Sequence, residues 1–354
     1  MGSGPVATAG DGSLAQAHPS PRRLRTLLTA IALAFLAVVP GVGGSVIGAR
    51  AAGQDPVIAA AGDIACDPTN PAFNGRDGTP AACQMRATSK ILVGLQDAGT
   101  LSAVLTLGDN QYRCGGLTAF HKSYDPTWGK VKPLTHPTPG DHEYMSTADS
   151  DGMDCSKDHD AAGYFKYFGA KAGGPARGYY SWDLPVSDGS SWHLIALNSN
   201  CGYIGGCEPG SPEEQWLRAD LAANPADCTL AYWYQARFSS GKHGSSVDYD
   251  AFWRDLYAAG AEVVLNGHDH DYERFALQTP DQVRSPDGLR EFVVGTGGVG
   301  HGYFRPMSEL NSVVRNVKTY GVLQLTLHPD TYDWQFLPVV GKRWSDSGTG
   351  NCHN

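Results

Sequence analysis

The sequence predicts a layered α/β domain with central sheets. Short apolar runs recur along the chain, and helical stretches lie between several of them, which is typical of sheets covered by helices. Most runs end in Gly, Asp, Asn or His, and open α/β sheets place their chemistry at such strand ends. The runs are "PVIAAAGDIA" (56–65), "LSAVLTLGDN" (101–110), "THPTPGDHE" (135–143), "SWHLIALNSN" (191–200), "CTLAYWY" (228–234), "AEVVLNGHDH" (261–270) and "REFVVGTGG" (290–298).

Three stretches are predicted to be helical, namely residues 84–97, 211–223 and 247–259. The second begins with Ser211 and Glu214, the spacing of a capping box in which each side chain bonds the other residue's backbone N–H. Residues 320–339 instead alternate in hydropathy around a His-Pro-Asp turn. They are therefore predicted to form a hairpin that makes one sheet edge antiparallel.

Residues 1–51 are predicted to be a cleaved export signal. "SPRRLRTLLTAIALAFLAVV" places arginines before a short apolar stretch, and "ARA" at 49–51 fits a small-residue cleavage site. The apolar stretch is shorter than the about 20 residues that a membrane helix needs, although an uncleaved anchor is the alternative. We expect residues 52–354 to form one secreted domain without stable membrane association, since no repeat or long linker divides them.

The cysteines and the charge narrow the class of protein. All eight cysteines follow residue 51, an even number typical of disulfide-bonded extracellular domains, and no CxxC pair favours the alternative of a zinc site. Cys201 and Cys207 can close a Gly-rich loop, and Cys352 can hold the C-terminus. A net charge of −9 argues against a nucleic-acid partner. It allows an anionic small substrate, because bound cations can reverse the local field.

Carboxylates and imidazoles gather where the predicted strands end. Oxygen and nitrogen ligands suit Zn, Mn and Fe, and one carboxylate can bridge two ions about 4 Å apart. Gly267 is expected to free the backbone for a sharp turn before the last pair of imidazoles. A single such motif is more often a turn, but all of them in order after apolar strands favour a metal site. The residues are Asp63, Asp109 in "GDNQY", Asp141 and His142 in "GDHE", and His268 and His270 in "GHDH".

In these motifs the chain resembles the calcineurin-like metallophosphoesterases, and among them the purple acid phosphatases of the secreted bacterial type. The family pattern is Asp, GDxxY, GNH(D/E), a His near a strand end, and GHxH; its counterparts here are Asp63, "GDNQY", "GDHE", "AYWYQARFSSGKHG" and "GHDH". Tyr112 indicates the purple acid phosphatase branch, since other members carry DxH where this chain has "DIA". The resemblance covers roughly residues 55–340. It implies a four-layer α/β/β/α sandwich of two mixed sheets flanked by helices.

The resemblance implies two metal ions. Fe(III) would be held by Asp63, Tyr112 and His270, because a trivalent charge keeps a phenol with an ordinary pKa of about 10 deprotonated. Asp109 would bridge to a second ion, Mn, Zn or Fe. That ion would also be bound by the two remaining strand-end ligands, Asp141 and His268.

Two further histidines have implied roles in the reaction. A hydroxide between the ions would attack phosphorus in line, while metals and histidines stabilise the charge. His142, oriented by Glu143, would donate a proton to the leaving group, and His243 would contact the phosphate.

The chain departs from the family pattern at the second metal. Asp141 stands where the family has Asn, and Tyr234 stands where a His ligand is expected; the spacing to His243 supports that alignment. A phenol binds a divalent ion poorly. Three outcomes are open: a harder ion such as Mn held with water or Gln235, a one-metal enzyme, or a site that Tyr234 occludes.

We therefore expect a secreted metal-dependent phosphomonoesterase, resembling acid phosphatases, that hydrolyses small phosphate esters. A repurposed or non-hydrolytic protein with an impaired second metal site is the rival from another class. A phosphodiesterase is the further alternative. The sequence does not assign the substrate, the metal pair or the oligomeric state.

Overall fold

The computed structural model describes residue 1 and residues 53–145, 154–174 and 177–353. The predicted export signal, apart from Met1, lies outside the described residues. The chain divides into a unit of residues 1–47 and a unit of residues 48–354, and the second unit holds the sheets. Among the described residues, no helix has the length and apolar character needed to cross a membrane.

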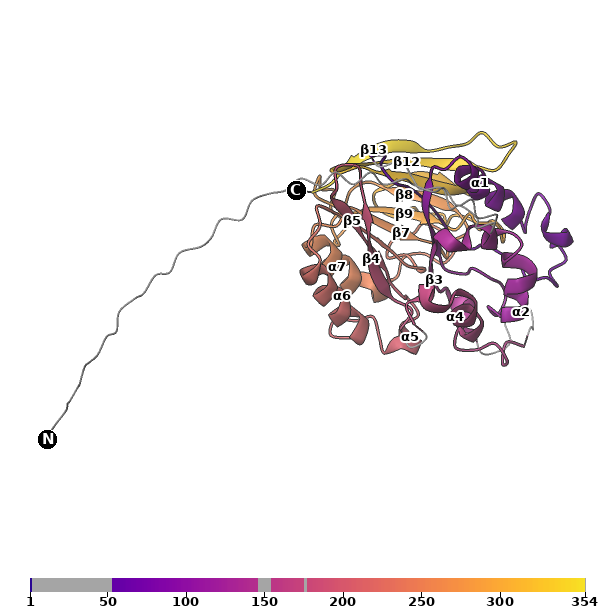
Figure 1. Ribbon diagram of the computed structural model, residues 1–354, viewed down its shortest axis with the longest axis horizontal. Helices are drawn as coiled ribbons and strands as arrows, with labels where there is room; N and C mark the ends of the chain where they lie inside the picture. The colour runs from indigo at the N-terminus through magenta and orange to yellow at the C-terminus, as the bar shows by residue number, and fades with distance from the viewer. Residues whose placement is uncertain (2–52, 146–153, 175–176, 354) are drawn as a thin grey trace, which may run out of the picture. The chain divides into compact units, whose positions relative to one another are not determined.

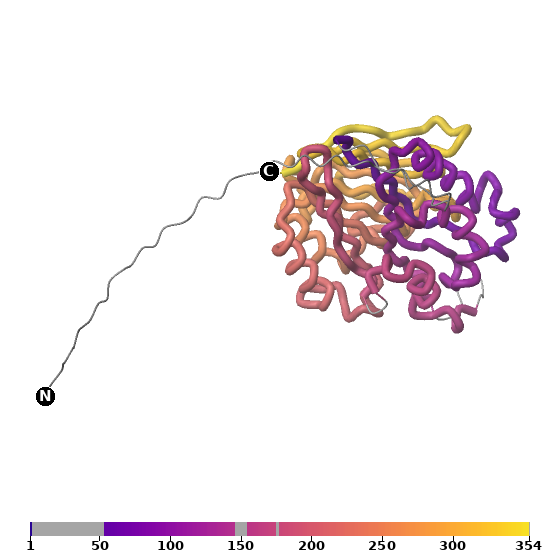
Figure 2. Tube along the Cα trace, in the orientation of Figure 1, coloured from indigo at the N-terminus to yellow at the C-terminus, as the bar shows by residue number. Residues whose placement is uncertain are grey.

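One of the two sheets has six strands in the order β13-β12-β11-β1-β2-β3. β1, β2 and β3 run parallel, whereas β11, β12 and β13 continue the sheet antiparallel. Figure 2 shows the yellow C-terminal segment beside the indigo first strand, as the β1–β11 pairing requires. The predicted hairpin is thus confirmed as β11 and β12. The strands are β1 (Val57–Ala61), β2 (Leu101–Leu107), β3 (Thr135–Thr138), β11 (Gly321–Leu327), β12 (Thr331–Pro338) and β13 (Ser347–Asn351).

The other sheet has seven strands in the order β10-β8-β9-β7-β6-β5-β4. β5, β6, β7 and β9 are parallel, and the antiparallel strands β4, β8 and β10 make this sheet mixed as well. The strands are β4 (Tyr180–Pro185), β5 (Ser191–Ala196), β6 (Cys228–Tyr232), β7 (Val263–Asn266), β8 (Tyr272–Phe275), β9 (Arg290–Val294) and β10 (Ser312–Asn316).

The three predicted helices are present as α1 (Met85–Asp97), α6 (Pro212–Ala223) and α7 (Asp250–Ala258), the last preceded by a 3-10 turn at Val247–Tyr249. The capping of α6 differs from the predicted box in one half. The Ser211 hydroxyl accepts from the backbone N–H of Glu214, but the Glu214 carboxylate accepts from the N–H of Gly210 rather than of Ser211. The shorter helices are α2 (Leu117–Ala119), α3 (Asp141–Tyr144), α4 (Ala162–Phe168) and α5 (Cys201–Ile204).

Two apolar clusters lie between the layers of the fold; one joins α1 and the two sheets, and the other lies between the second sheet and the helices α6 and α7. Alternate residues of β6 point to opposite faces, so that Leu230 belongs to the cluster shared by the two sheets and Ala231 to the cluster under α6 and α7. Leu92 of α1 joins the first cluster, and Phe252 of α7 joins the second. Figure 1 shows α1 and the pair α6 and α7 at different sides of the strands. The predicted sandwich of two mixed sheets flanked by helices is confirmed.

All eight cysteines are paired, so the zinc alternative for them is wrong. Cys201–Cys207 closes the short Gly-rich loop, and Cys228–Cys352 ties the C-terminal segment to the start of β6, as predicted. The other two pairs are Cys66–Cys83 and Cys114–Cys155.

Candidate metal centre

The strand-end side chains converge from both sheets. Asp63 follows β1, Asp109 follows β2, and His268 follows β7. All three have left-handed backbone conformations, with φ of 59°, 45° and 70°. Such conformations cost about 1–3 kcal/mol for a non-glycine residue and gather at functional sites, where the surrounding structure enforces them. The sharp turn after β7 therefore lies at His268 and not at Gly267, where the sequence predicted it.

Gly267 has another role. A Cβ there would lie 2.7 Å from the carbonyl oxygen of Leu107 and 3.0 Å from Oδ2 of Asp63. Glycine is needed because β7 passes close to the end of β2, and the close approach lets the His268 N–H donate to Oδ2 of Asp63 at 2.9 Å.

Asp63 lies at the middle of a group of possible hydrogen-bond donors. Its Oδ1 accepts from the Tyr112 hydroxyl at 2.9 Å and from the Tyr234 hydroxyl at 3.0 Å, and it lies 3.2 Å from Nε2 of His270. The Tyr112 oxygen is also 3.2 Å from the same His270 nitrogen. The three predicted ligands of the first ion, Asp63, Tyr112 and His270, are thus brought together, with Tyr234 as a further neighbour.

Asp109 connects this group to a second one. Its Oδ2 accepts a short hydrogen bond from Tyr234, and its Oδ1 accepts from the His142 N–H at 3.0 Å. Ligand atoms of Asp109, Asp141 and His142 lie within 4.8 Å of one another. His268, predicted as the third ligand of the second ion, places Nδ1 3.9 Å from Oδ2 of Asp141.

The neighbouring groups shift the pKa values of the buried Asp63 and Asp109 carboxyls in opposite directions. Burial opposes ionisation of Asp63, but the charges of His270 and His268 and the hydrogen bonds from His270 and Tyr112 lower its pKa below the ordinary value. For Asp109, burial together with the charges of Asp141 and Asp63 raises the pKa to about 7. A site of this kind, with fully buried acids side by side, favours a cation.

The phenols and His243 are shifted toward their neutral forms. Burial, followed by the charges of Asp109 and Asp63, raises the pKa of Tyr112 and of Tyr234 well above 10. Burial and the neighbouring His268 lower the pKa of His243. Only a strong local positive charge would deprotonate either phenol.

The orientation of His142 differs from the expectation. Its Nδ1 lies 2.6 Å from the carbonyl oxygen of Arg113, and its ring packs 4.3 Å from that of Tyr112. Glu143 does not orient it; the buried Glu143 carboxylate accepts instead from the N–H groups of Gln111 at 2.9 Å and Gly140 at 2.7 Å. Glu143 thereby ties the motif of Asp141 to the motif of Asp109. The role of His142 as proton donor stays a prediction.

Asp269, between the two histidines of "GHDH", contacts the candidate site and was missed by sequence reasoning. It is buried, and its carboxylate accepts from the backbone N–H of His243 at 2.7 Å and of Gly244 at 3.2 Å, and from the Ser239 hydroxyl at 2.5 Å. It holds the loop that places the exposed His243 ring 4.1 Å from the His268 ring.

Gln235, predicted as a possible second-site ligand, is engaged elsewhere. Its amide oxygen accepts a short hydrogen bond from the Ser199 hydroxyl, which in turn accepts from the Gln235 N–H at 3.1 Å. Tyr234 points the other way, into the group around Asp63 and Asp109.

These donors fit the metals that the resemblance implies. Asp63, Asp109, Tyr112 and His270 offer three oxygens and a nitrogen around one point, a set suited to a hard trivalent ion. Asp109 and Asp141 with the nearby imidazoles offer a second, more open set. Tyr234 stands where the family pattern has a His, and its hydroxyl reaches the first set.

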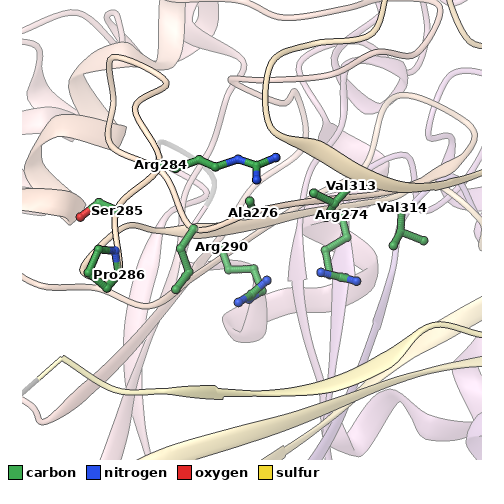
Figure 3. A pocket seen from close by; sticks show the side chains of 9 residues that line it. Arg274, Ala276, Arg284, Ser285, Pro286, Arg290, Val313 and Val314 are labelled. Carbon is green, nitrogen blue, oxygen red and sulfur yellow. The ribbon is translucent and has the colours of Figure 1, made fainter.

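The Arg-lined hollow of Figure 3 lies elsewhere. It has a volume of about 480 Å³ and is lined by Arg274, Arg284 and Arg290 with apolar neighbours. Arg290 pairs in register with Val263, at the beginning of β7, whereas the predicted ligands His268 and His270 follow the end of that strand. Arg274 is neutralised by Asp346 at 2.7 Å. The hollow contains none of the predicted site residues.

Two curated plant proteins are similar to the chain in sequence. Purple acid phosphatase 15 of Arabidopsis thaliana is 25% identical over 234 residues, which cover 59% of this chain and 39% of the relative. Purple acid phosphatase 22 of the same plant is 25% identical over 248 residues, which cover 64% and 54%. The chain therefore spans about half or less of the length of these relatives. No protein-family profile matches it.

Solved structures show the same fold. Purple acid phosphatase PPD1 of yellow lupin matches with a TM-score of 0.67 at 16% identity, over 84% of this chain and 54% of that one. GAP50, the anchor in the inner membrane complex of Plasmodium, matches with a TM-score of 0.55 at 14% identity, over 85% and 90%. PhoD matches with a TM-score of 0.50 at 15% identity, over 85% and 70%. The two-sheet fold is that of the purple acid phosphatases, to which the chain is distantly similar in sequence.

Proposed function

We propose that the protein is a secreted, metal-dependent phosphomonoesterase acting on small phosphate esters. The observation that carries this proposal is the convergence, on the fold of the purple acid phosphatases, of Asp63, Asp109, Tyr112 and His270 from four separate segments, with Tyr234 contacting both carboxylates. The four disulfides are typical of an oxidising compartment and support secretion.

The chain's own residues bind the cations and position the ester. Asp63, Tyr112 and His270 would hold Fe(III), and Asp109, Asp141 and His268 would hold a second ion, Mn, Zn or Fe. Bound cations supply an activated water and neutralise charge on the phosphoryl group.

Two histidines serve the substrate. The exposed His243, fixed through Asp269, is placed to donate a hydrogen bond to a phosphoryl oxygen. His142 has Nδ1 fixed by the Arg113 carbonyl, so Nε2 is the nitrogen that can carry a proton toward a leaving alkoxide.

Metal analysis and hydrolysis test the proposal together. The mature protein is stripped with a chelator, reloaded with Fe, Mn or Zn, and assayed with a chromogenic phosphate monoester and with the corresponding diester. Metal-dependent turnover of the monoester supports the proposal. Preference for the diester would assign the protein as a phosphodiesterase instead.

One observation favours a second candidate, a non-hydrolytic binding protein. The Tyr234 hydroxyl lies between the carboxylates of Asp63 and Asp109, where it limits the space for two ions. The fold also serves purposes other than hydrolysis, since GAP50 is described as an anchor. At most one metal per chain, with no turnover of either ester, would favour this candidate.

A further inference from the structure

We propose that Tyr234 is a ligand of the same cation as Tyr112, so that the centre is a two-phenolate site selective for a trivalent ion. The proposal rests on the metal dependence proposed above. It assigns to Tyr234 a role that neither a second-site ligand nor an occluding side chain would have.

The two phenolic oxygens approach the same atom. Tyr112 lies 2.9 Å and Tyr234 lies 3.0 Å from Oδ1 of Asp63, and Nε2 of His270 lies 3.2 Å from it. Tyr234 also bonds to Asp109, the carboxylate that the first ion shares. An ion that draws in Asp63, Asp109 and His270 therefore has both phenols within reach.

Tyr234 is held where it is. Its side chain is 1% exposed, and its ring packs 4.9 Å from that of His268. On the other side the ring lies against Gly108, where an added Cβ would be 2.4 Å from Cδ2 of the tyrosine. Gly108 has a φ of 89°, so the close approach and the backbone both require glycine there. Because the ring is buried between these neighbours, we expect the phenol to keep its place when a cation binds.

The charges then determine which ion fits. When the ion binds, each phenol loses its proton to water and forms an oxygen–metal bond, which leaves Asp63, Asp109, Tyr112 and Tyr234 as four anionic donors beside neutral His270. A trivalent ion leaves one uncompensated negative charge in this buried site, whereas a divalent ion leaves two. Because uncompensated buried charge is costly and hard oxygen donors suit Fe(III), the fourth anionic donor favours the trivalent ion.

Visible absorption of the iron-loaded protein tests the proposal without any substrate. Phenolate bound to Fe(III) gives a charge-transfer band, and its intensity reports how many phenolates are bound. The mature protein is stripped of metal and titrated with ferric citrate, with iron per chain measured on the same samples. We compare Tyr234→Phe, Tyr112→Phe and the double variant with Tyr232→Phe. Tyr232 is buried at the end of β6, two residues before Tyr234, but its hydroxyl donates to the carbonyl oxygen of His136 at 3.3 Å.

We expect each single variant at the centre to lose about half of the band intensity per iron, the double variant to lose all of it, and Tyr232→Phe to keep it. Tyr234→His serves as the second variant if Tyr234→Phe does not fold, as judged by circular dichroism, and it should also keep about half of the band. A full band in Tyr234→Phe with complete loss in Tyr112→Phe would overturn the proposal. So would a wild-type protein that binds Zn(II) or Mn(II) more tightly than Fe(III).

The outcome is separable from the proposed function. A two-phenolate band in a protein that hydrolyses no ester leaves this proposal standing while the phosphatase proposal fails. Ester turnover with a band that depends on Tyr112 alone does the reverse.

Discussion

The hydroxyl of Tyr234 lies 3.0 Å from Oδ1 of Asp63, a residue 171 positions earlier in the chain. The contact crosses from the segment after β6 to the segment after β1, and therefore from one sheet to the other. It puts a neutral phenol against the carboxylate at which the predicted ligands of the first ion meet.

Replacing Tyr234 with His should strengthen the second metal site. The shorter imidazole leaves space between Asp63 and Asp109 and adds a nitrogen donor that binds divalent ions at neutral pH. We expect binding of a second divalent ion and a rise of about tenfold in kcat/KM for a phosphate monoester, or about 1.4 kcal/mol. Metal analysis and steady-state kinetics check this. A lower rate than wild type, with metal content unchanged, would mean that Tyr234 assists the reaction.

Replacing His270 with Ala should weaken metal binding at the candidate centre. Its imidazole contacts both Asp63 and Tyr112, and we expect His270→Ala to lower metal affinity and ester turnover by more than about 100-fold, beyond the cost of losing an outer-shell partner. His159→Ala is the matched control, because His159 is exposed and pairs with Asp160. Equal metal content in the two variants would rule His270 out as a ligand.

Asp269 should act through His243. We expect Asp269→Asn to lower kcat/KM by about tenfold, mainly through a higher KM, because the loop that presents His243 loses its carboxylate acceptor. His243→Ala should have a similar effect, and the double variant should be no worse than His243→Ala alone. Additive losses in the double variant would show that the two residues act separately.

Gly140 should tolerate no side chain. A Cβ there would lie 2.1 Å from Oδ1 and 2.2 Å from the backbone nitrogen of Asp109. We expect Gly140→Ala to lower the free energy of unfolding by about 1–3 kcal/mol and to weaken metal binding. Gly94→Ala, at an exposed position of α1 with open space around it, should instead raise stability by about 0.5–1 kcal/mol. Urea denaturation compares the two, and equal effects would contradict the prediction.

His193 should make stability depend on pH. The buried ring contacts Asp183 at 2.8 Å and Asp220 at 2.9 Å. Burial lowers its pKa, but the hydrogen bonds and charges of Asp220 and Asp183 outweigh burial and raise the pKa above the ordinary value. The stabilisation is therefore complete below about pH 6.5 and is lost as the pH rises through the folded-state pKa.

Thermal unfolding across this range measures the effect. We expect the Tm advantage of the wild type over His193→Gln to be largest at about pH 6 and to shrink toward about pH 9. Other groups titrate in both proteins, so the difference isolates His193. An advantage that grows with pH would reverse the sign and contradict the prediction.

The fold and most of the candidate metal-binding cluster could be predicted because both depend on local patterns. An apolar run followed by a polar residue marks a strand end, and the carboxyl ends of neighbouring parallel strands meet at one edge. That reasoning brings Asp63 and Asp109 to one edge of the same sheet, whereas His270 follows a strand of the other sheet and was added by the family resemblance. The tail hairpin and the three long helices follow from periodicity in the same way.

Other features depend on contacts between distant segments. The hydroxyl of Tyr234 reaches Asp63 because two strand ends pack together and a phenol is long enough to span the distance. The sequence motif specifies neither the packing nor the distance. The left-handed turn falls on His268, whereas Gly267 is needed for the close approach to Leu107. The pairing of the cysteines follows from tertiary proximity, which their spacing does not specify.

A crystal structure of the purified mature protein, with anomalous scattering measured at the iron, manganese and zinc edges, tests the centre most directly. We expect an iron peak within about 2.0–2.3 Å of oxygens from Asp63, Tyr112 and Tyr234 and of Nε2 of His270. An iron peak away from these atoms, or no peak at any of the three edges, would contradict the proposal that these strand ends bind a cation.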